Sequence, residues 1–255
     1  LQEILPLLRN TLSDSFPLLR VLDAPLTRRG AIRRPLIERH QMLAEAGELA
    51  QVNYLSTLFA MQNEDPSVAL SKDDLVGLCT ELLVSGVDTT VASLEWTMAH
   101  LVKDPLIQAR LHSEIRDVVA GNEHRRIRET DLPSLTYLQA VVTESLRLHP
   151  PAQSTFPYVV SQPCKLGGYD ITPNMVLLFS LTAISRDPKL WDEPLEFRPE
   201  RMLSTDVDIT GRNRMSMLPF SAGRRICPGL GLGTIHVQLF IARMVQAYEW
   251  RSSEP

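Results

Sequence analysis

The sequence predicts a mainly α-helical fold with a small antiparallel β-sheet. Good helix formers with apolar positions three and four residues apart fill most of the 255-residue chain. One stretch, residues 156–181, instead has β-branched runs separated by Gly167-Gly168 and Pro173, a pattern typical of short strands and turns. The composition, 44% hydrophobic and 22% charged, is that of a globular chain large enough to bury a sizeable core.

The first helices are indicated by periodicity and by one capping signal. Residues 1–60 indicate helices broken by turns. A long helix is then predicted over residues 71–102. It begins at Ser71, and the acidic residues that follow in SKDD give a start that resembles a capping box. Such a helix would be about 45 Å long, enough to cross a whole domain.

Proline and glycine delimit the helices that follow. Asp104-Pro105 ends the long helix and starts the next one, because proline suits a first helical position. A helix over residues 135–148 ends before Pro150-Pro151. A loop at residues 219–231 leads into a last helix over residues 229–248.

Charge and cysteine content exclude several classes of protein. The chain carries 26 basic and 30 acidic residues, whereas a nucleic-acid-binding protein would show a basic excess, so no nucleic acid partner is expected. Cys79, Cys164 and Cys227 are odd in number and far apart, which fits neither a disulfide framework nor a cysteine-rich zinc site and indicates a reducing compartment. No apolar run approaches the roughly 18 residues that cross a bilayer, so no membrane segment is expected in this chain.

One cysteine has unusual neighbours. Cys227 lies in PFSAGRRICPGLG, close to the start of the last predicted helix. Backbone N–H groups there and the cation of Arg225 favour a thiolate. Gly223 and Gly229 permit tight turns and close approach of a flat ligand. A thiolate held in this way can be a nucleophile, a redox sensor or a metal ligand. A nucleophile needs a positioned base, and the nearest histidine, His236, lies about two turns into the helix.

The loop pattern resembles that of a known family. F-x-x-G-x-R-x-C-x-G, formed by Phe220, Gly223, Arg225, Cys227 and Gly229, resembles the haem-binding loop of the cytochrome P-450 family, the haem-thiolate monooxygenases. The resemblance implies haem b, iron protoporphyrin IX, as cofactor, with those five residues around it. It also implies that Cys227 is the metal ligand, donating electron density to the iron.

A second resemblance joins two distant segments. Glu144-Ser-Leu-Arg147 resembles the E-x-x-R motif of the family, and FRPERM, which contains Arg201, resembles its P-E-R segment. The resemblance implies that Glu144, Arg147 and Arg201 form a buried charged triad. Met202 stands where family members commonly have Phe, a gap that a flexible thioether can fill.

A third motif lies midway along the long helix. SGVDTT, Ser85 to Thr90, resembles the oxygen-activation motif of the family, with Ser85 where Ala or Gly is usual. Because glycine weakens a helix and threonine can bond back to the preceding turn, a locally opened helix is expected here. The resemblance implies that Thr89 donates a hydrogen bond to dioxygen and that Asp88 relays protons.

The resemblance extends from about Ser71 to Trp250 and is closest to plant microsomal members. It implies an NADPH-dependent flavoprotein reductase and dioxygen as partners, and a hydrophobic small-molecule substrate. The run GRRICPGLGLGTIHVQLFIARMVQ is most similar to a group that hydroxylates or epoxidises fatty acids, which makes a fatty acid a candidate substrate. The residues implied to contact substrate are Val84, Gly86, Ser154, Thr155 and Phe156.

The resemblance also defines what the chain is expected to lack. Residues 1–255 would be the C-terminal part of a single cytochrome P-450 domain, without the N-terminal half and the final β-hairpin of the fold. The full-length protein is expected at the cytosolic face of the endoplasmic reticulum membrane, held by an N-terminal anchor outside this chain. Tyr158 stands where family members often place Arg or His against a haem propionate, so Arg225 is expected to carry more of that role.

Two other functions remain open from the sequence. A haem-thiolate enzyme that rearranges peroxides would need no dioxygen, but such enzymes tend to lose the threonine that this chain keeps in Asp88-Thr89-Thr90. The chain could also be a truncated, non-catalytic fragment. In that case apolar surface of the long helix would be exposed, which is a liability for solubility.

Overall fold

The computed structural model describes residues 54–64, 70–120, 124–204, 207–212 and 215–252. The chain divides into two compact units, Leu1–Ser85 and Gly86–Pro255, which are considered separately below. Most of the helices expected over residues 1–60 lie outside the described residues. The assignment of residues 1–255 to one domain stays a prediction.

The described part of the first unit is a small helical pair. Helix α3 (Tyr54–Glu64) and the start of α4 (Lys72–Lys103) share a minor core centred on Leu58 and Leu75. The start of α4 is capped reciprocally, since the Ser71 N–H donates to Asp74 Oδ2 at 2.8 Å and the Asp74 N–H donates to Ser71 Oγ at 3.2 Å. The Ser71 hydroxyl also donates to Asp74 Oδ2 at 2.7 Å, and this bond, together with the one from the Ser71 N–H, lowers the pKa of the Asp74 carboxyl.

Helix α4 is continuous through the segment where the sequence predicts an opening, and that prediction is wrong. The hydroxyls of Ser85 and Thr90 donate to the carbonyls of Glu81 and Gly86, both at 2.6 Å, without interrupting the helix. Threonine and serine can bond back in this way while the backbone ladder stays intact. By length and composition alone, Asp73–Lys103 is also apolar enough to cross a membrane, contrary to expectation, although the core helix of a soluble protein can pass the same test.

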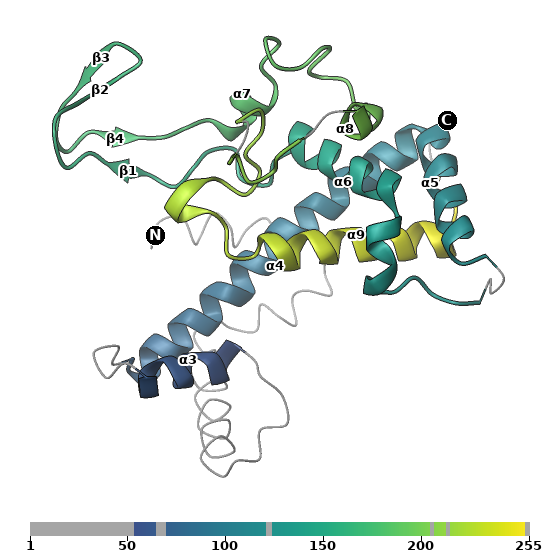
Figure 1. Cartoon of the computed structure of the whole chain (residues 1–255), viewed down its shortest axis with the longest axis horizontal. Helices are drawn as coiled ribbons and strands as arrows, with labels where there is room; N and C mark the ends of the chain where they lie inside the picture. Colours follow the sequence, from purple (N-terminus) through teal and green to yellow (C-terminus); the bar gives the residue numbers. More distant parts are fainter. Residues whose placement is uncertain (1–53, 65–69, 121–123, 205–206, 213–214, 253–255) are drawn as a thin grey trace. The chain divides into compact units, whose positions relative to one another are not determined.

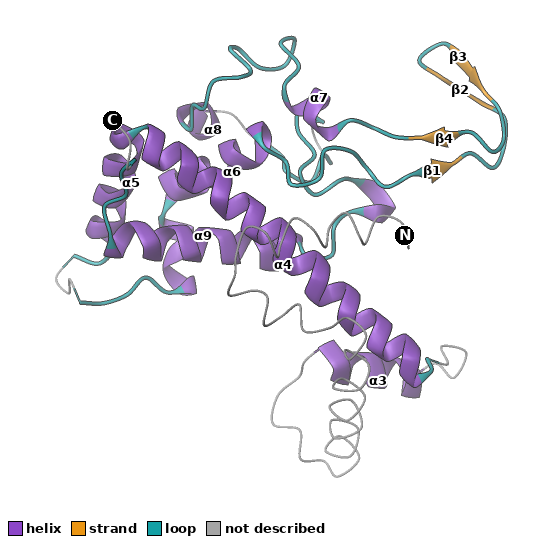
Figure 2. Ribbon diagram, turned by 180° about the vertical axis from the view of Figure 1, so that it is seen from behind, coloured by secondary structure: helices purple, strands orange, loops and turns teal. Residues whose placement is uncertain are grey.

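The second unit is built around a helical core. Helices α5 (Pro105–Val118), α6 (Thr136–Leu148) and α9 (Leu230–Ala247) pack together, and the 3-10 helix η3 (Glu129–Ser134) contacts α6 and α9 (Figure 1). Figure 2 shows the same packing from behind. Side chains with no exposed surface line this core: Leu101, Leu111, Ile115, Leu135, Leu138, Val141 and Ile241. The apolar faces that periodicity predicts are therefore the faces that are buried.

Helix α5 begins as the sequence predicts. The Asp104 carboxylate accepts from the N–H groups of Leu106 at 3.0 Å and Ile107 at 3.3 Å, and Pro105 occupies the first turn. An aspartate cap followed by proline is a strong helix start, because the cap satisfies N–H groups that have no partner within the helix.

In the part of the chain that the structure describes, the strands form two nested pairs. Strand β1 (Tyr158–Val159) pairs antiparallel with β4 (Val176–Leu177), and β2 (Cys164–Leu166) pairs antiparallel with β3 (Tyr169–Ile171) (Figure 1). The turn between β2 and β3 is Gly167-Gly168, with φ of +58° and +87°, which suits a two-residue hairpin. The predicted fold class is confirmed, although the antiparallel structure is two small sheets rather than one.

Irregular segments connect the sheets to the last helix. They contain the short helices α7 (Leu181–Ser185) and α8 (Glu200–Ser204), and the 3-10 helix η4 (Gly223–Arg225). Within them Gly211 has φ +65°, and a Cβ atom there would lie only 2.3 Å from Leu218 Cδ2. The backbone conformation therefore favours glycine at this position, and a larger residue would also have to displace the end of the Leu218 side chain.

Candidate functional site

A fully buried ion pair lies on α6. Glu144 and Arg147 have no exposed side-chain surface, and they meet through two parallel bonds: Arg147 Nε to Glu144 Oε2 and Nη2 to Oε1, each 2.8 Å. This fork geometry is the strongest form of the arginine–carboxylate contact. The spacing of three residues places both side chains on one face of the helix, so the helix itself holds the pair together.

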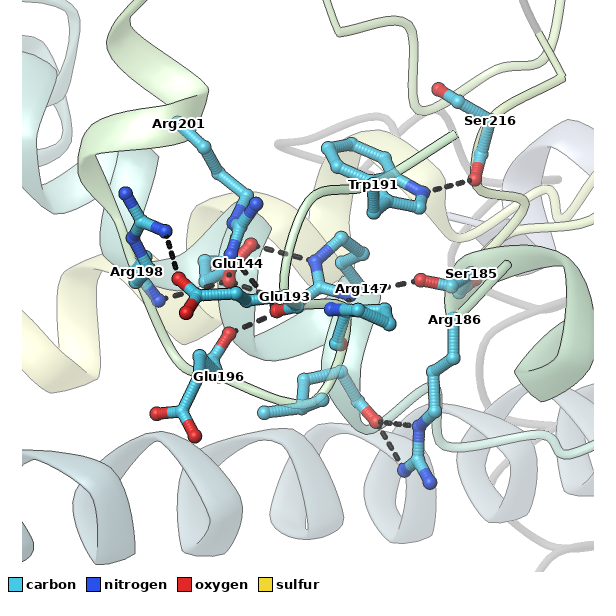
Figure 3. A network of polar contacts seen from close by, with 12 residues as sticks. Glu144, Arg147, Ser185, Arg186, Trp191, Glu193, Glu196, Arg198, Arg201 and Ser216 are labelled. Carbon is cyan, nitrogen blue, oxygen red and sulfur yellow. Dashed lines mark hydrogen bonds and ion pairs between the residues drawn. The ribbon is translucent and has the colours of Figure 1, made fainter. Parts of the chain in front are cut away.

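Arg201 of α8 joins the same carboxylate. Its Nε atom lies 3.1 Å from Glu144 Oε1, and 11% of its side chain is exposed. The Arg198 N–H also donates to Glu144 Oε1, at 3.0 Å. The structure thus brings Arg201, which is 57 residues from Glu144 in the sequence, to the Glu144–Arg147 pair, and surrounds one carboxylate with donors (Figure 3).

Arg147 connects this carboxylate to the segment after α7. Its Nη1 donates to the carbonyls of Ser185 at 2.9 Å and Pro194 at 2.8 Å, and its Nη2 also donates to Glu196 O at 3.1 Å. With the two bonds to Glu144, all five guanidinium N–H groups have acceptors. Figure 3 shows Arg147 between Glu144 and Ser185. A lysine could not replace these bonds, because it offers three donors from a single atom.

The Arg147 guanidinium also lies over an anchored aromatic ring. Its central carbon is 5.1 Å from the centre of the Trp191 ring, and Trp191 Nε1 donates to Ser216 O at 2.9 Å. Trp191 and Ser216 are both buried. Trp191 therefore contacts the charged cluster through its ring and, through its N–H, the segment that precedes the cysteine loop.

The cysteine loop is a tight turn that leads into α9. The Cys227 N–H donates to Phe220 O at 2.9 Å, and the Leu230 N–H donates to Cys227 O at 3.3 Å. Gly223 has φ +68°, which favours glycine. Cys227 is a free, half-buried thiol, and a Cβ on Gly229 would lie 3.6 Å from its sulfur. The loop thus presents one sulfur atom, with glycines on both sides, just before the N-terminus of a helix.

Arg225 lies on Tyr158, the residue that departs from the family pattern. The Arg225 guanidinium carbon is 4.6 Å from the centre of the Tyr158 ring, and its Nη1 donates to Pro157 O at 3.1 Å. Arg225 is exposed while Tyr158 is half-buried. The stack fixes the direction of the guanidinium and connects the cysteine loop to β1.

The chemistry of the cysteine loop and the space beside it fit a haem. Among the described residues, no group of three or more His, Cys, Asp or Glu side chains could hold a metal ion, and Cys227 offers a single sulfur atom. A Cβ on Gly223 would meet nothing within 4 Å, which leaves open space beside the loop. One thiol, open glycine surface and a nearby guanidinium fit a haem with an iron and acidic side chains.

The residues of the SGVDTT motif lie on α4. Asp88 is half-buried, and burial raises the pKa of its carboxyl above the ordinary value. Thr89 and Gly86 are exposed, and a Cβ on Gly86 would meet nothing within 4 Å. The Ser93 hydroxyl donates to Thr89 O at 2.9 Å. The motif therefore combines a carboxyl that holds its proton more strongly than usual with an uncrowded helix surface.

The residues implied to contact substrate differ in their surroundings. Thr155 uses its hydroxyl to accept from the Phe179 N–H at 3.2 Å, so it supports the backbone. Ser154 forms an isolated bridge with Ser180, and Phe156 is 83% exposed. Val84 is exposed and belongs to the first unit.

An aromatic and histidine cluster, which was not predicted from the sequence, lies where α4 and α6 end. Nε2 of His100 and Nε2 of His149 are 2.9 Å apart, Trp96 stacks on His149 at 3.8 Å, and Phe197 stacks on His100 at 4.0 Å. Burial lowers the pKa of each histidine to about 4. Trp96, His100 and His149 also line a shallow cavity of about 340 Å³. The spacing of four residues between Trp96 and His100 was a signal that they share a helix face, but their partners lie on distant elements.

Comparison with known proteins identifies close relatives. A family model described as Cytochrome P450 matches residues 12–255. Cytochrome P450 98A1 of Sorghum bicolor is 42% identical over 228 residues, which are 89% of this chain and 43% of that protein. Flavonoid 3'-monooxygenase of Petunia hybrida is 42% identical over 203 residues, which are 77% of this chain and 39% of that protein. The chain therefore spans less than half the length of these curated relatives.

Solved structures agree with this result. A zebrafish cytochrome P450, in a structure with progesterone, is 30% identical, with a TM-score of 0.72 over 88% of this chain and 52% of that chain. The likeness covers the mostly helical fold with its small antiparallel sheets, and the resemblance drawn from the sequence motifs is confirmed. Because the family model matches nearly the whole chain, this protein belongs to the cytochrome P450 family.

Proposed function

We propose that this protein acts as a haem-dependent monooxygenase that inserts one atom of dioxygen into a hydrophobic organic substrate. The observation that carries the proposal is Cys227, a half-buried thiol on a hydrogen-bonded loop just before α9. Family membership supports the assignment, because the relatives of this chain include a protein named as a monooxygenase. Membership also implies a haem cofactor, and we propose haem b.

The loop residues would hold the cofactor in distinct ways. Cys227 would bind the iron through its sulfur, which the loop presents just before the N-terminus of α9. Phe220, Gly223 and Gly229 would border the ring, and Arg225 would pair with a propionate while its stack on Tyr158 fixes the guanidinium. When bound, haem supplies the activation of dioxygen and the transfer of one oxygen atom to substrate.

Helix α4 would contribute the polar groups of the reaction. Burial raises the pKa of Asp88, so this carboxyl holds its proton more strongly than an ordinary aspartate, which suits a proton relay. The Thr89 hydroxyl would donate a hydrogen bond to dioxygen. Glu144, Arg147 and Arg201 would take no part in the chemistry and would hold the cysteine side of the fold in place through Trp191.

The substrate is proposed only as a class. The petunia relative is named for action on a flavonoid, whereas the run around Cys227 indicated fatty acids. Both are hydrophobic small molecules. The proposed substrate contacts are those that the family resemblance implies: Val84, Gly86, Ser154, Thr155 and Phe156. An NADPH-dependent flavoprotein reductase is the proposed electron donor, and the endoplasmic reticulum membrane the proposed location.

A carbon monoxide spectrum of the reduced chain supplied with haem tests the assignment of Cys227. We expect a red-shifted, thiolate-type band in the parent chain and in Cys164→Ala, since Cys164 is exposed on β2 and distant in sequence. The band should be lost in Cys227→Ala. A band that persists in Cys227→Ala would remove Cys227 as the ligand, and no band in the parent would favour the non-catalytic fragment.

Replacing Thr89 tests its role separately from haem binding. In a form of the protein that turns over, Thr89→Ala should consume dioxygen while yielding less product, because the hydroxyl that directs proton delivery is lost. Thr90→Ala is the matched control, since the Thr90 hydroxyl donates to Gly86 O within the helix. The ratio of product to dioxygen is the measurement, and an unchanged ratio in Thr89→Ala would exclude the role.

A further inference from the structure

The helix that carries Glu144 and Arg147 has no cap of its own. At the start of α6 the N-cap residue is Leu135, whose side chain makes no cap hydrogen bond and has no exposed surface. Leucine is among the poorest N-cap residues, because it offers no acceptor to the first N–H groups of the helix. Leu135 belongs to the hydrophobic core, so the residue at the cap position contributes packing and not a hydrogen bond.

The missing cap is supplied from the neighbouring helix. Glu114 of α5 accepts from the Tyr137 N–H through Oε1 at 2.7 Å and from the Leu138 N–H through Oε2 at 3.0 Å. The Thr136 hydroxyl also donates to Glu114 Oε1, at 3.2 Å. These two N–H groups, at the second and third helical positions, are the ones that an N-cap side chain would serve. A carboxylate here also gains from the positive end of the helix dipole.

The capped residue is connected onward to the charged triad. Tyr137 donates its hydroxyl to Glu200 Oε1 at 3.0 Å, and Glu200 is the neighbour of Arg201 in α8. Glu144 lies two turns after Tyr137 on the same face of α6, because residues seven apart are nearly aligned. A movement of the start of α6 is therefore transmitted along the helix to Glu144 and through Tyr137 to α8.

We propose that Glu114 is a positioning residue that sets the placement of α6, and thereby holds Glu144 where Arg201 and the Arg198 N–H can reach it. This goes beyond the proposed function, since it concerns the helices alone and requires no haem. A carboxylate with two oxygens on two successive N–H groups fixes α6 along its axis as well as sideways. Hydrophobic contacts, which are not directional, would allow α6 to slide.

Hydrogen exchange of individual amides in the full chain tests the proposal. Tyr137 and Leu138 report on the cap, Arg198 reports on Glu144, and Ile241 in the core of α9 serves as the reference. In Glu114→Ala we expect Tyr137 and Leu138 to exchange about tenfold faster relative to Ile241, the scale of a lost cap. Arg198 should exchange at least about threefold faster.

Two further variants separate the proposal from a general loss of stability. Glu114→Gln keeps one carbonyl acceptor and should lie between the parent and Glu114→Ala, and it carries the test if the alanine variant does not fold. Asp117→Asn, on an exposed carboxylate of the same helix, should leave all these amides unchanged. If the Tyr137 and Leu138 amides of Glu114→Ala exchange at rates within about twofold of those in Asp117→Asn, Glu114 is not the cap of α6. If those two amides exchange faster but the Arg198 amide does not, Glu114 caps α6 locally and the positioning role is overturned.

Discussion

At the scale of single residues, Arg147 shows how a buried charge is made tolerable. Its five N–H groups bond to both carboxylate oxygens of Glu144 and to three carbonyls. Removing two charges from water costs several kcal/mol for each ion, and only complete pairing offsets that cost. The cluster is therefore intolerant of the loss of Arg147, because Glu144 Oε2 and three carbonyls would each lose a donor in the protein interior.

Arg147→Lys should lower the free energy of unfolding by about 3–5 kcal/mol, because the charge remains but most of its directed bonds are lost. Urea unfolding followed by circular dichroism measures the change. Arg110→Lys is the matched control: Arg110 pairs with Glu200 at 2.8 Å, but about half of its side chain is exposed. Arg110→Lys should lower the free energy of unfolding by at most about 1 kcal/mol. Equal losses in the two variants would contradict this account of Arg147.

The sequence predicted the members of the triad but not most of its bonds. Glu144 and Arg147 are three apart on a helix, so their meeting follows from helical geometry. The carbonyls of Ser185, Pro194 and Glu196 carry no signal in the sequence, because every residue has the same backbone acceptor. Glu114 was missed for a related reason, since its partners are backbone N–H groups of another helix.

At the scale of elements, the helices were the most predictable part of the structure. Periodicity, Asp104-Pro105 and Pro150-Pro151 placed α5 and the end of α6 well, because these signals act within a few residues. The nested strand pairs were less predictable, since strands of two or three residues are too short to show a clear alternation. The continuity of α4 was missed because serine and threonine permit both an intact and an opened helix.

Two glycines in different elements allow a matched test. Gly211 has φ +65°, and a Cβ there would overlap the end of the Leu218 side chain, whereas a Cβ on Gly231 in α9 would meet nothing within 4 Å. Gly211→Ala should destabilise the chain by more than about 1 kcal/mol. Gly231→Ala should stabilise it by about 0.5–1 kcal/mol through helix propensity. Thermal unfolding compares the two, and a stable Gly211→Ala variant would show that this loop relaxes.

At the scale of the whole molecule, the histidine pair connects stability to pH. His100 and His149 share one N–H between facing nitrogens, and burial lowers the pKa of each to about 4. Between that value and the ordinary histidine pKa of about 6.5, the unfolded chain binds more protons than the folded one. The folded state is therefore favoured above this range and loses stability as the pH falls through it. The hydrogen bond from Arg125 lowers the pKa of Asp131, so protonation of this carboxyl reduces the free energy of unfolding only below about pH 4.

The free energy of unfolding should fall between about pH 6.5 and pH 4, by at most about 1.4 kcal/mol per pH unit for each histidine. Urea titrations at several pH values measure it. His100→Phe keeps a ring to stack on Phe197 but removes one titrating group, and should show a shallower fall. His236→Asn, on an exposed residue of α9, should keep the slope of the parent. A slope unaffected by His100→Phe would assign the pH dependence to other groups.

The bonds of Arg147 also have a consequence for the order in which the chain folds. Its bond to Glu144 spans three residues and can form as soon as α6 is helical, but its bond to Ser185 closes 38 residues, and the bond of Arg201 to Glu144 closes 57. Closing such loops costs chain entropy before any contact compensates for it. We expect α6 to form early with the ion pair already in place. The segment from Ser185 to Arg201 would then dock late, so that slow refolding of this half of the chain reports the arrival of Arg201 rather than the formation of helices.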